Sequence, residues 1–151
     1  MDSEVVDLPA ELAIRADAGD LRDASQWLEQ ACYMRAVPAD QIFRLDLCLN
    51  EALANVISHG GESAAAIPVL LWLGVKSDHG DAEATLTIAD AGVPFNPLTA
   101  TGMVQPHSLA EAEPGGLGLT MISSFSDEIG YRFHQGKNHL TLTVRWPQAR
   151  S

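Results

Sequence analysis

Three short segments of the sequence carry residues that can do chemistry, and the first is "NEALANVISHG", residues 50–60. Glu51 and Asn55 are four residues apart, so on a helix their side chains point the same way, one turn apart. In that arrangement the carboxylate can accept a proton while the neutral amide binds a hard cation through its oxygen. A solvated helix face would carry the same two residues, so the pair alone leaves both interpretations open.

The second segment is "DAGVPFNP", residues 90–97, at the end of an apolar strand. Asp90 can accept a hydrogen bond from an exocyclic amine, and Gly92 allows a planar ring to approach the backbone closely. An ordinary turn is the alternative, because Gly, Pro and Asn are common wherever a chain reverses direction.

The third segment is "PGGLGLTMI", residues 114–122, in which a glycine-rich loop runs into a predicted helix. Backbone amides at Gly115, Gly116 and Gly118, with the positive end of the helix, can cradle a phosphate. The segment lacks the GK[ST] ending of a P-loop, and no strand directly precedes it as in the dinucleotide-binding fingerprint. Taken alone it is a weak indication.

The elements that must position these residues begin with an expected strand over residues 11–16 and a helix over 19–36, with Asp17 and Asp20 as candidate caps. A second helix is expected from about 41 to 59, with Asp40 as its candidate cap. At 100° per residue its apolar arc, which we expect to pack on a sheet, consists of Ile42, Leu45, Leu49, Ala52, Leu53, Val56 and Ile57.

The second half of the chain has the period of strands. Residues 69–76 and 83–90 form an expected hairpin joined by "SDHGD", and 130–133 with 139–146 form another. Residues 91–116 are long for a loop and indicate a functional lid, and a third helix is expected over 118–129. The order predicts one α+β domain over residues 1–151, a two-layer sandwich of a mixed, mostly antiparallel sheet with helices on one face.

Composition excludes several classes of function. Twenty acidic against nine basic residues give a net charge of -11, which disfavours direct nucleic-acid binding and binding to anionic membranes. No apolar run reaches the ~20 residues of a membrane span, and the acidic start does not resemble a secretion signal, so we expect a cytoplasmic protein. The two cysteines, Cys32 and Cys48, are expected to be small core residues.

Taken in order, "NEALANVISHG", "DAGVPFNP" and "GGLGLTMI" resemble the asparagine box and the two glycine boxes of the gyrase, Hsp90 and histidine-kinase-like (GHKL) ATPase superfamily. Within it the chain is most similar to small anti-sigma factors that are also serine-protein kinases. The resemblance extends over roughly the whole chain and implies a Bergerat-type ATP-binding fold.

The resemblance also implies a role for each matching residue. Glu51 would be the general base, and Asn55 would coordinate the Mg²⁺ that bridges the phosphates of ATP. Asp90 would bind the adenine amino group, with Gly92 shaping the adenine pocket. The phosphates would be held under the lid by residues of the glycine loop and the start of the helix after it, namely Gly116, Gly118, Leu119 and Thr120.

The implied partners are a sigma factor, which such proteins hold inactive, and a STAS-type anti-anti-sigma antagonist, which they phosphorylate on a serine. A homodimer is also compatible with the family. One departure from the family pattern concerns the lid, since residues 96–118 contain no Lys or Arg to reach the terminal phosphate. The alternative to a kinase is therefore a nucleotide-binding anti-sigma or adaptor module with little or no kinase activity.

A second departure concerns the last strand. A threonine that often touches the adenine in this family has no clear counterpart, because Asn138 or His139 stands there. The sequence assigns a role to neither.

Overall fold

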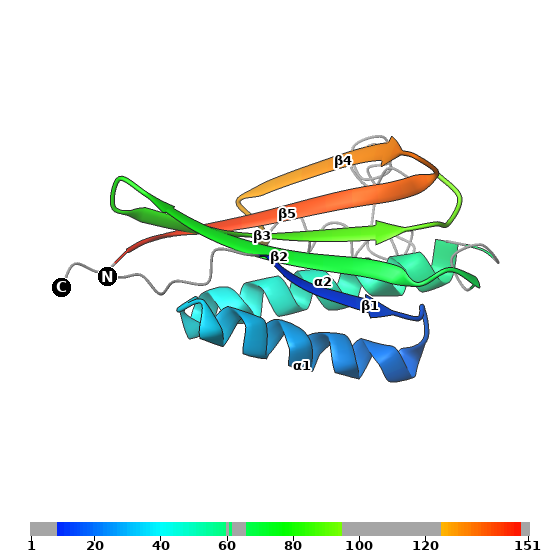
Figure 1. The fold of residues 1–151 in the computed structure, drawn as a ribbon, viewed down its shortest axis with the longest axis horizontal. Coiled ribbons are helices and arrows are strands. Elements are labelled where there is room, and N and C mark those ends of the chain that lie inside the picture. Colours follow the sequence, from blue (N-terminus) through cyan, green and yellow to red (C-terminus); the bar gives the residue numbers. More distant parts are fainter. Residues whose placement is uncertain (1–8, 60, 62–65, 95–124, 149–151) are drawn as a thin grey trace, which may run out of the picture.

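The computed structural model describes residues 9–59, 61, 66–94 and 125–148. Two helices cover one face of a five-stranded sheet, as Figure 1 shows. The elements in chain order are β1 (Ala10–Ile14), α1 (Ala18–Met34), α2 (Ala39–His59), β2 (Val69–Asp78), β3 (Asp81–Asp90), β4 (Glu128–His134) and β5 (Lys137–Pro147). The expected α+β two-layer architecture is confirmed.

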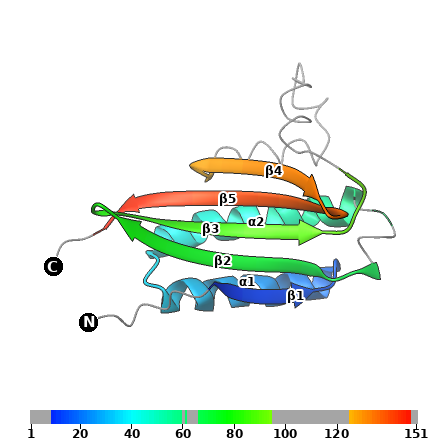
Figure 2. The same ribbon diagram turned by 45° about the horizontal axis from the view of Figure 1, so that its top comes forward.

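The strands lie in the order β1-β2-β3-β5-β4, and each of the four neighbouring pairs is antiparallel (Figure 2). β3 and β5 are adjacent although more than forty residues separate them in the chain, and their register places Asp90 opposite Asn138. β4 is therefore an edge strand that pairs only with β5 in the described part of the sheet.

One hydrophobic core lies between the sheet and the helices. Strand residues alternate between it and the other face, as in β3, where Ala82, Ala84, Leu86 and Ile88 are buried. Both cysteines are buried and free, as expected, and burial is the main reason that the pKa of Cys32 rises to about 12 and that of Cys48 to about 11. The charges of Arg35 and Arg44 lower these two values only in part.

Both helices begin near the predicted positions. Asp17 caps α1, because its Oδ1 accepts a hydrogen bond from the Asp20 amide at 2.9 Å. Asp20 Oδ2 in turn accepts a hydrogen bond from the Arg15 amide at 2.7 Å, so both carboxylates bind backbone amides at the start of the helix. The prediction for Asp40 was wrong: α2 starts at Ala39, and Asp40 lies within its first turn, where its charge favours the helix dipole.

The buried face of α2 differs from the predicted arc, because it adds Gln41, Cys48 and Asn55 and leaves out Ile57. Leu45, Leu49 and Leu53 are fully buried as expected, but Ile57 is 43% exposed. Cys48 lies outside the predicted arc but is buried, in agreement with its expected place in the core. The buried face of the helix is thus rotated slightly toward Cys48 and Asn55, which brings the polar residues of the first segment closer to the core.

Two boundaries in the second half also differ. β2 and β3 pair as far as Asp78 and Asp81, so the turn between them consists of His79 and Gly80, both with positive φ, rather than the five residues expected. The third helix was predicted to extend to residue 129, but Phe125 is its last helical residue and Glu128 already belongs to β4. Residues 118–124 of that predicted helix lie outside the described part.

Candidate nucleotide-binding site

Glu51 and Asn55 occupy the C-terminal half of α2 and follow each other by one turn. Glu51 is partly buried, whereas Asn55 is only 8% exposed. The Nδ2 atom of Asn55 is buried and has no hydrogen-bond partner in the described part of the chain. A buried amide nitrogen without an acceptor costs about 1–3 kcal/mol, so this nitrogen is suited to donate to an acceptor outside the described residues.

Asp90 is the last residue of β3 and is 8% exposed. Its Oδ1 accepts a hydrogen bond from the amide of Gly92 at 2.9 Å, which folds the chain after β3 into a tight turn. Oδ1 also accepts from Nδ2 of Asn138 on β5, at 3.1 Å. The carboxylate is therefore fixed in direction by two donors on the same oxygen.

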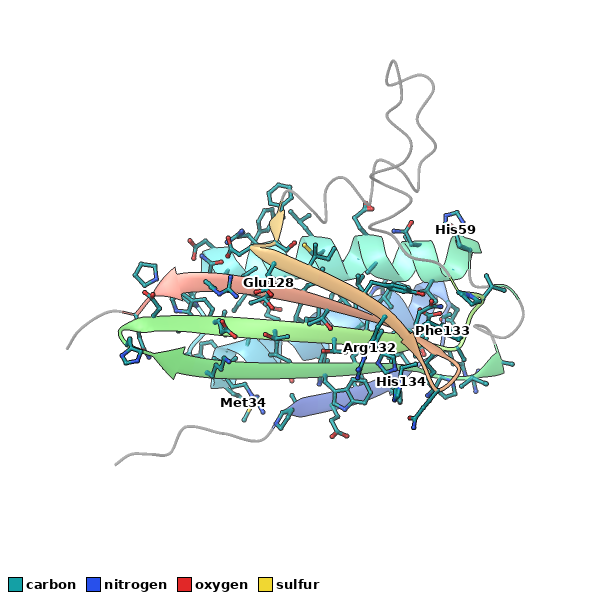
Figure 3. All side chains as sticks on the ribbon, turned by 90° about the horizontal axis from the view of Figure 1, so that it is seen from above. Met34, His59, Glu128, Arg132, Phe133 and His134 are labelled. Carbon is teal, nitrogen blue, oxygen red and sulfur yellow. The ribbon has the colours of Figure 1, made fainter. Side chains whose placement is uncertain are left out.

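The two parts of the site lie at the same end of the molecule. In Figures 1 and 2, α2 and β3 both run toward this end, so the C-terminal half of the helix and the end of the strand are on one side of the fold. Figure 3 shows His59, the last residue of α2, at the end where Phe133 and His134 of β4 also lie. The fold thus places the C-terminal half of α2, with Glu51 and Asn55, at the same end of the molecule as the end of β3 that carries Asp90.

The predicted phosphate-binding residues Gly116, Gly118, Leu119 and Thr120 lie outside the described residues, as does nearly all of the predicted lid. Their roles remain predictions from the sequence.

The Asn55 side chain has both a donor and an acceptor to offer to a bound group. No group of three or more His, Cys, Asp or Glu side chains that could hold a metal ion occurs within the described ranges. The two ends of the Asn55 amide differ in chemistry: the oxygen can bind a hard cation such as Mg²⁺, and the nitrogen, which has no partner among the described residues, can donate to a phosphate oxygen.

Asn138 is a site residue to which sequence reasoning assigned no role. It is 5% exposed, it bonds Asp90, and its side chain also receives a hydrogen bond from the hydroxyl of Tyr131 on β4. The sequence does contain a signal for this residue. Asn138 is in phase with the buried Leu140 and Leu142, so it is a polar residue on the inward face of a strand and needs a hydrogen-bond partner.

A separate cavity of about 320 Å³ lies between α1 and the N-terminal half of α2, away from these residues. Its lining comes from both helices and consists of Arg22, Ser25, Gln26, Glu29, Ala39, Ile42, Phe43 and Asp46. It contains none of the predicted site residues.

The helix that carries Glu51 and Asn55 is also tied to the edge of the sheet. Arg44 forms an ion pair with Asp127, which precedes β4. Partial burial acts to raise the pKa of Asp127, but hydrogen bonds from the Arg145 amide and from Arg44, with the charges of both arginines, leave that pKa below its usual range.

No helix in the described ranges has the length and apolar character needed to cross a membrane.

Comparison with known proteins agrees with this geometry. The profile of the histidine kinase-like ATPase domain matches residues 14–145, which is most of the chain. The serine/threonine-protein kinase BtrW of Bordetella bronchiseptica is 34% identical over 132 residues, covering 87% of this chain and 90% of that protein.

Two solved structures share the fold at low sequence identity. The RsbU and RsbW domains of Rv1364c from Mycobacterium tuberculosis match with a TM-score of 0.64 and 16% identity over 95% of this chain, which spans only 34% of that longer one. The SiaB–SiaC complex from Pseudomonas aeruginosa matches with a TM-score of 0.61 and 12% identity, over 89% of this chain and 88% of that one. The superfamily resemblance seen in the three sequence segments is confirmed, and the chain belongs to the histidine kinase-like ATPase domain family.

Proposed function

We propose that this protein is an ATP-dependent serine-protein kinase and anti-sigma factor of a bacterial partner-switching system. The observation that carries the proposal is the buried Asn55 amide one turn after Glu51, whose Nδ2 has no partner among the described residues, at the same end of the fold as the end of β3 that carries Asp90 (Figure 1). Identity of 34% to a protein named as a serine/threonine kinase supports the kinase activity. The partner would be a STAS-type antagonist, and the location would be the cytoplasm.

In the proposed reaction, Glu51 takes the proton of a serine hydroxyl on the antagonist. The serine oxygen forms a bond to the γ-phosphorus of ATP while the bond from that phosphorus to the β,γ-bridging oxygen breaks, which leaves ADP and phosphoserine. Mg²⁺ bound with the nucleotide would neutralise charge on the phosphates, and Asn55 would hold it through the amide oxygen. Asp90 and Gly92 would hold the adenine.

Protein partners fit the proposal. One structural neighbour was solved as the complex of SiaB with SiaC, and the other contains an RsbW domain beside an RsbU domain in a single chain. Phosphorylation of the antagonist would release it, after which this protein would again hold its sigma factor. A homodimer is compatible with this cycle.

The test is transfer of label from γ-labelled ATP to a serine of the cognate antagonist. Glu51→Gln should slow transfer by roughly 10²–10⁴-fold, the usual contribution of a general base, while ATP affinity stays within a few fold. Asp40→Asn, which changes an exposed carboxylate in the first turn of the same helix, is the matched control and should transfer at the wild-type rate. Unimpaired transfer by Glu51→Gln would exclude Glu51 as the base.

A second candidate follows from the acidic lid. Residues 96–118 contain no Lys or Arg, so a cation that would neutralise the terminal phosphate is missing from that segment. The protein would then be a nucleotide-binding anti-sigma or adaptor module. Tight ATP binding without transfer to the antagonist, in wild type as well as in Glu51→Gln, would favour this function over the kinase.

A further inference from the structure

Asn138 joins three parts of the fold at one point. It lies opposite Asp90 in the β3–β5 pair and opposite Phe133 in the β4–β5 pair. Its Nδ2 lies 3.1 Å from Asp90 Oδ1, 2.9 Å from the carbonyl oxygen of Val93 and 3.4 Å from that of Gly92. This one amide group therefore contacts both the carboxylate and the turn that follows it.

The orientation of the amide is determined by its surroundings. Nδ2 has two protons, and its three acceptors described above can only accept, so the two shorter contacts, to Val93 and Asp90, take one proton each. On the other side, Oδ1 of Asn138 accepts a hydrogen bond from the hydroxyl of Tyr131. A reversed amide would place its oxygen against a carboxylate and two carbonyls, which is electrostatically unfavourable.

The consequence falls on Asp90. Both described donors to its side chain, the amides of Gly92 and Asn138, bind Oδ1, so Oδ2 takes part in neither bond. Asp90 and Asn138 are 8% and 5% exposed, and a hydrogen bond in such a buried, low-dielectric environment is electrostatically stronger than in water. The carboxylate is thereby held in one orientation before any ligand arrives.

We infer that Asn138, anchored by Tyr131 of the edge strand, is a positioning residue that makes Asp90 selective for a 6-amino purine over a 6-oxo purine. The inference rests on the proposed nucleotide function. A carboxylate only accepts, so it binds the exocyclic amine of adenine and repels the oxygen that hypoxanthine carries at the same place. Selectivity requires that the carboxylate cannot turn away, and Asn138 supplies that restraint.

The experiment compares the affinities of the full chain for ATP and for inosine triphosphate, which differ at this position, by titration calorimetry without a protein partner. Wild type should prefer ATP. Asn138→Ala should weaken ATP binding by roughly tenfold, as expected for loss of a buried hydrogen bond, and inosine triphosphate binding much less, so that the affinity ratio falls toward one. Tyr131→Phe removes only a hydroxyl and should lower the ratio by about threefold.

Two measures keep the test decisive. Arg132→Ala changes an exposed neighbour of Tyr131 on the same edge strand and should leave the ratio unchanged. If Asn138→Ala fails to fold, as judged by circular dichroism, the milder Tyr131→Phe carries the test.

The outcomes separate the inference from the proposed function. If wild type binds neither nucleotide, the proposed function fails and the inference with it. If wild type prefers ATP and both variants keep that preference, or lose both nucleotides equally, the inference alone is overturned, because a merely structural role would affect both ligands alike. An equal affinity of wild type for the two nucleotides would also overturn it.

Discussion

Arg44 of α2 and Asp127, which precedes β4, face each other through two nitrogen–oxygen contacts of 3.4 Å each. Asp127 Oδ2 also accepts from the backbone amide of Arg145 at 2.6 Å. One carboxylate thus connects the helix that bears Glu51 and Asn55 to the last two strands of the sheet. The connection is a surface feature, since the Asp127 side chain is 37% exposed.

Asp127→Asn should destabilise the protein at neutral pH. Because the folded-state pKa of Asp127 is lowered, its contribution to the free energy of unfolding is present above the unfolded pKa near ~4 and is lost as the pH falls through the folded value. Because the Asp127 side chain is partly exposed and its charge interactions are screened by solvent, we expect the variant's free energy of unfolding to be only about 1 kcal/mol lower than that of wild type at pH 7. The difference should vanish in acid. Urea unfolding at a series of pH values measures it, with Asp23→Asn on α1 as the exposed control. A deficit that persists in acid would contradict this account.

The two thiols should make stability decline in alkali. Their folded pKa values, about 12 for Cys32 and about 11 for Cys48, lie above the ordinary value of 9.0, so the unfolded state loses its thiol protons first as the pH rises. The stabilisation is complete below pH 9.0 and is lost between there and the folded values. Cys48→Ala should therefore show a shallower decline than wild type over this range. Equal slopes in both proteins would argue against the buried thiols as the cause.

Asn55→Ala should have opposite effects on binding and on stability. If Asn55 holds Mg²⁺ as proposed, ATP affinity should fall roughly 10- to 100-fold with Mg²⁺ present, and the loss in EDTA should be much smaller, because only the contact with the cation is removed. The ligand-free variant should nevertheless gain about 1 kcal/mol, since Nδ2 is buried without a described partner.

Titration calorimetry and thermal unfolding measure the two effects of Asn55→Ala, and Ser58→Ala, an exposed change one turn later, should alter neither. A variant that loses stability instead would indicate that Asn55 has a structural role.

Leu49 and Ile57 should differ sharply when truncated, although both belong to the apolar arc of the same helix. Leu49 is fully buried, and Leu49→Ala should cost roughly 3–5 kcal/mol of unfolding free energy. Ile57 is 43% exposed, and Ile57→Ala should cost under about 1 kcal/mol. Chemical denaturation of both variants gives the comparison. Similar losses would mean that Ile57 is packed against the core after all.

The regular elements were predictable because their periods are strong. Alternation along β3 and the helical spacing of Leu45, Leu49 and Leu53 each indicate one buried face, and the structure has both. The hairpin turn was predicted too long because Ser77 and Asp78 have turn-like side chains. Cross-strand pairing of Asp78 with Asp81 overrides that local preference.

The extent of each buried face was less predictable. A periodic pattern tells which residues of a helix share a side, but not how far along the helix the sheet reaches or how the helix is rotated upon it. Ile57 belongs to the predicted apolar arc but is 43% exposed for this reason.

Asp90 and Gly92 could be selected as a site from sequence because a known motif contains them, whereas Asn138 could not. Its role arises from the register that places it opposite a residue 48 positions earlier, and register between distant strands is not a local property. The available signal was its phase with the buried leucines of β5. A polar residue on an inward face needs a partner, and the sequence does not say which one.

The strand order affects when, during folding, Asp90 and Asn138 come into contact. The β2–β3 hairpin closes over two residues, His79 and Gly80, whereas joining β3 to β5 closes a loop of more than forty and carries a larger entropic cost. The pair that brings Asn138 to Asp90 is therefore expected to form late, after the hairpin. During synthesis on the ribosome, the growing chain would therefore fold most of its core before the contact between Asn138 and Asp90 could form.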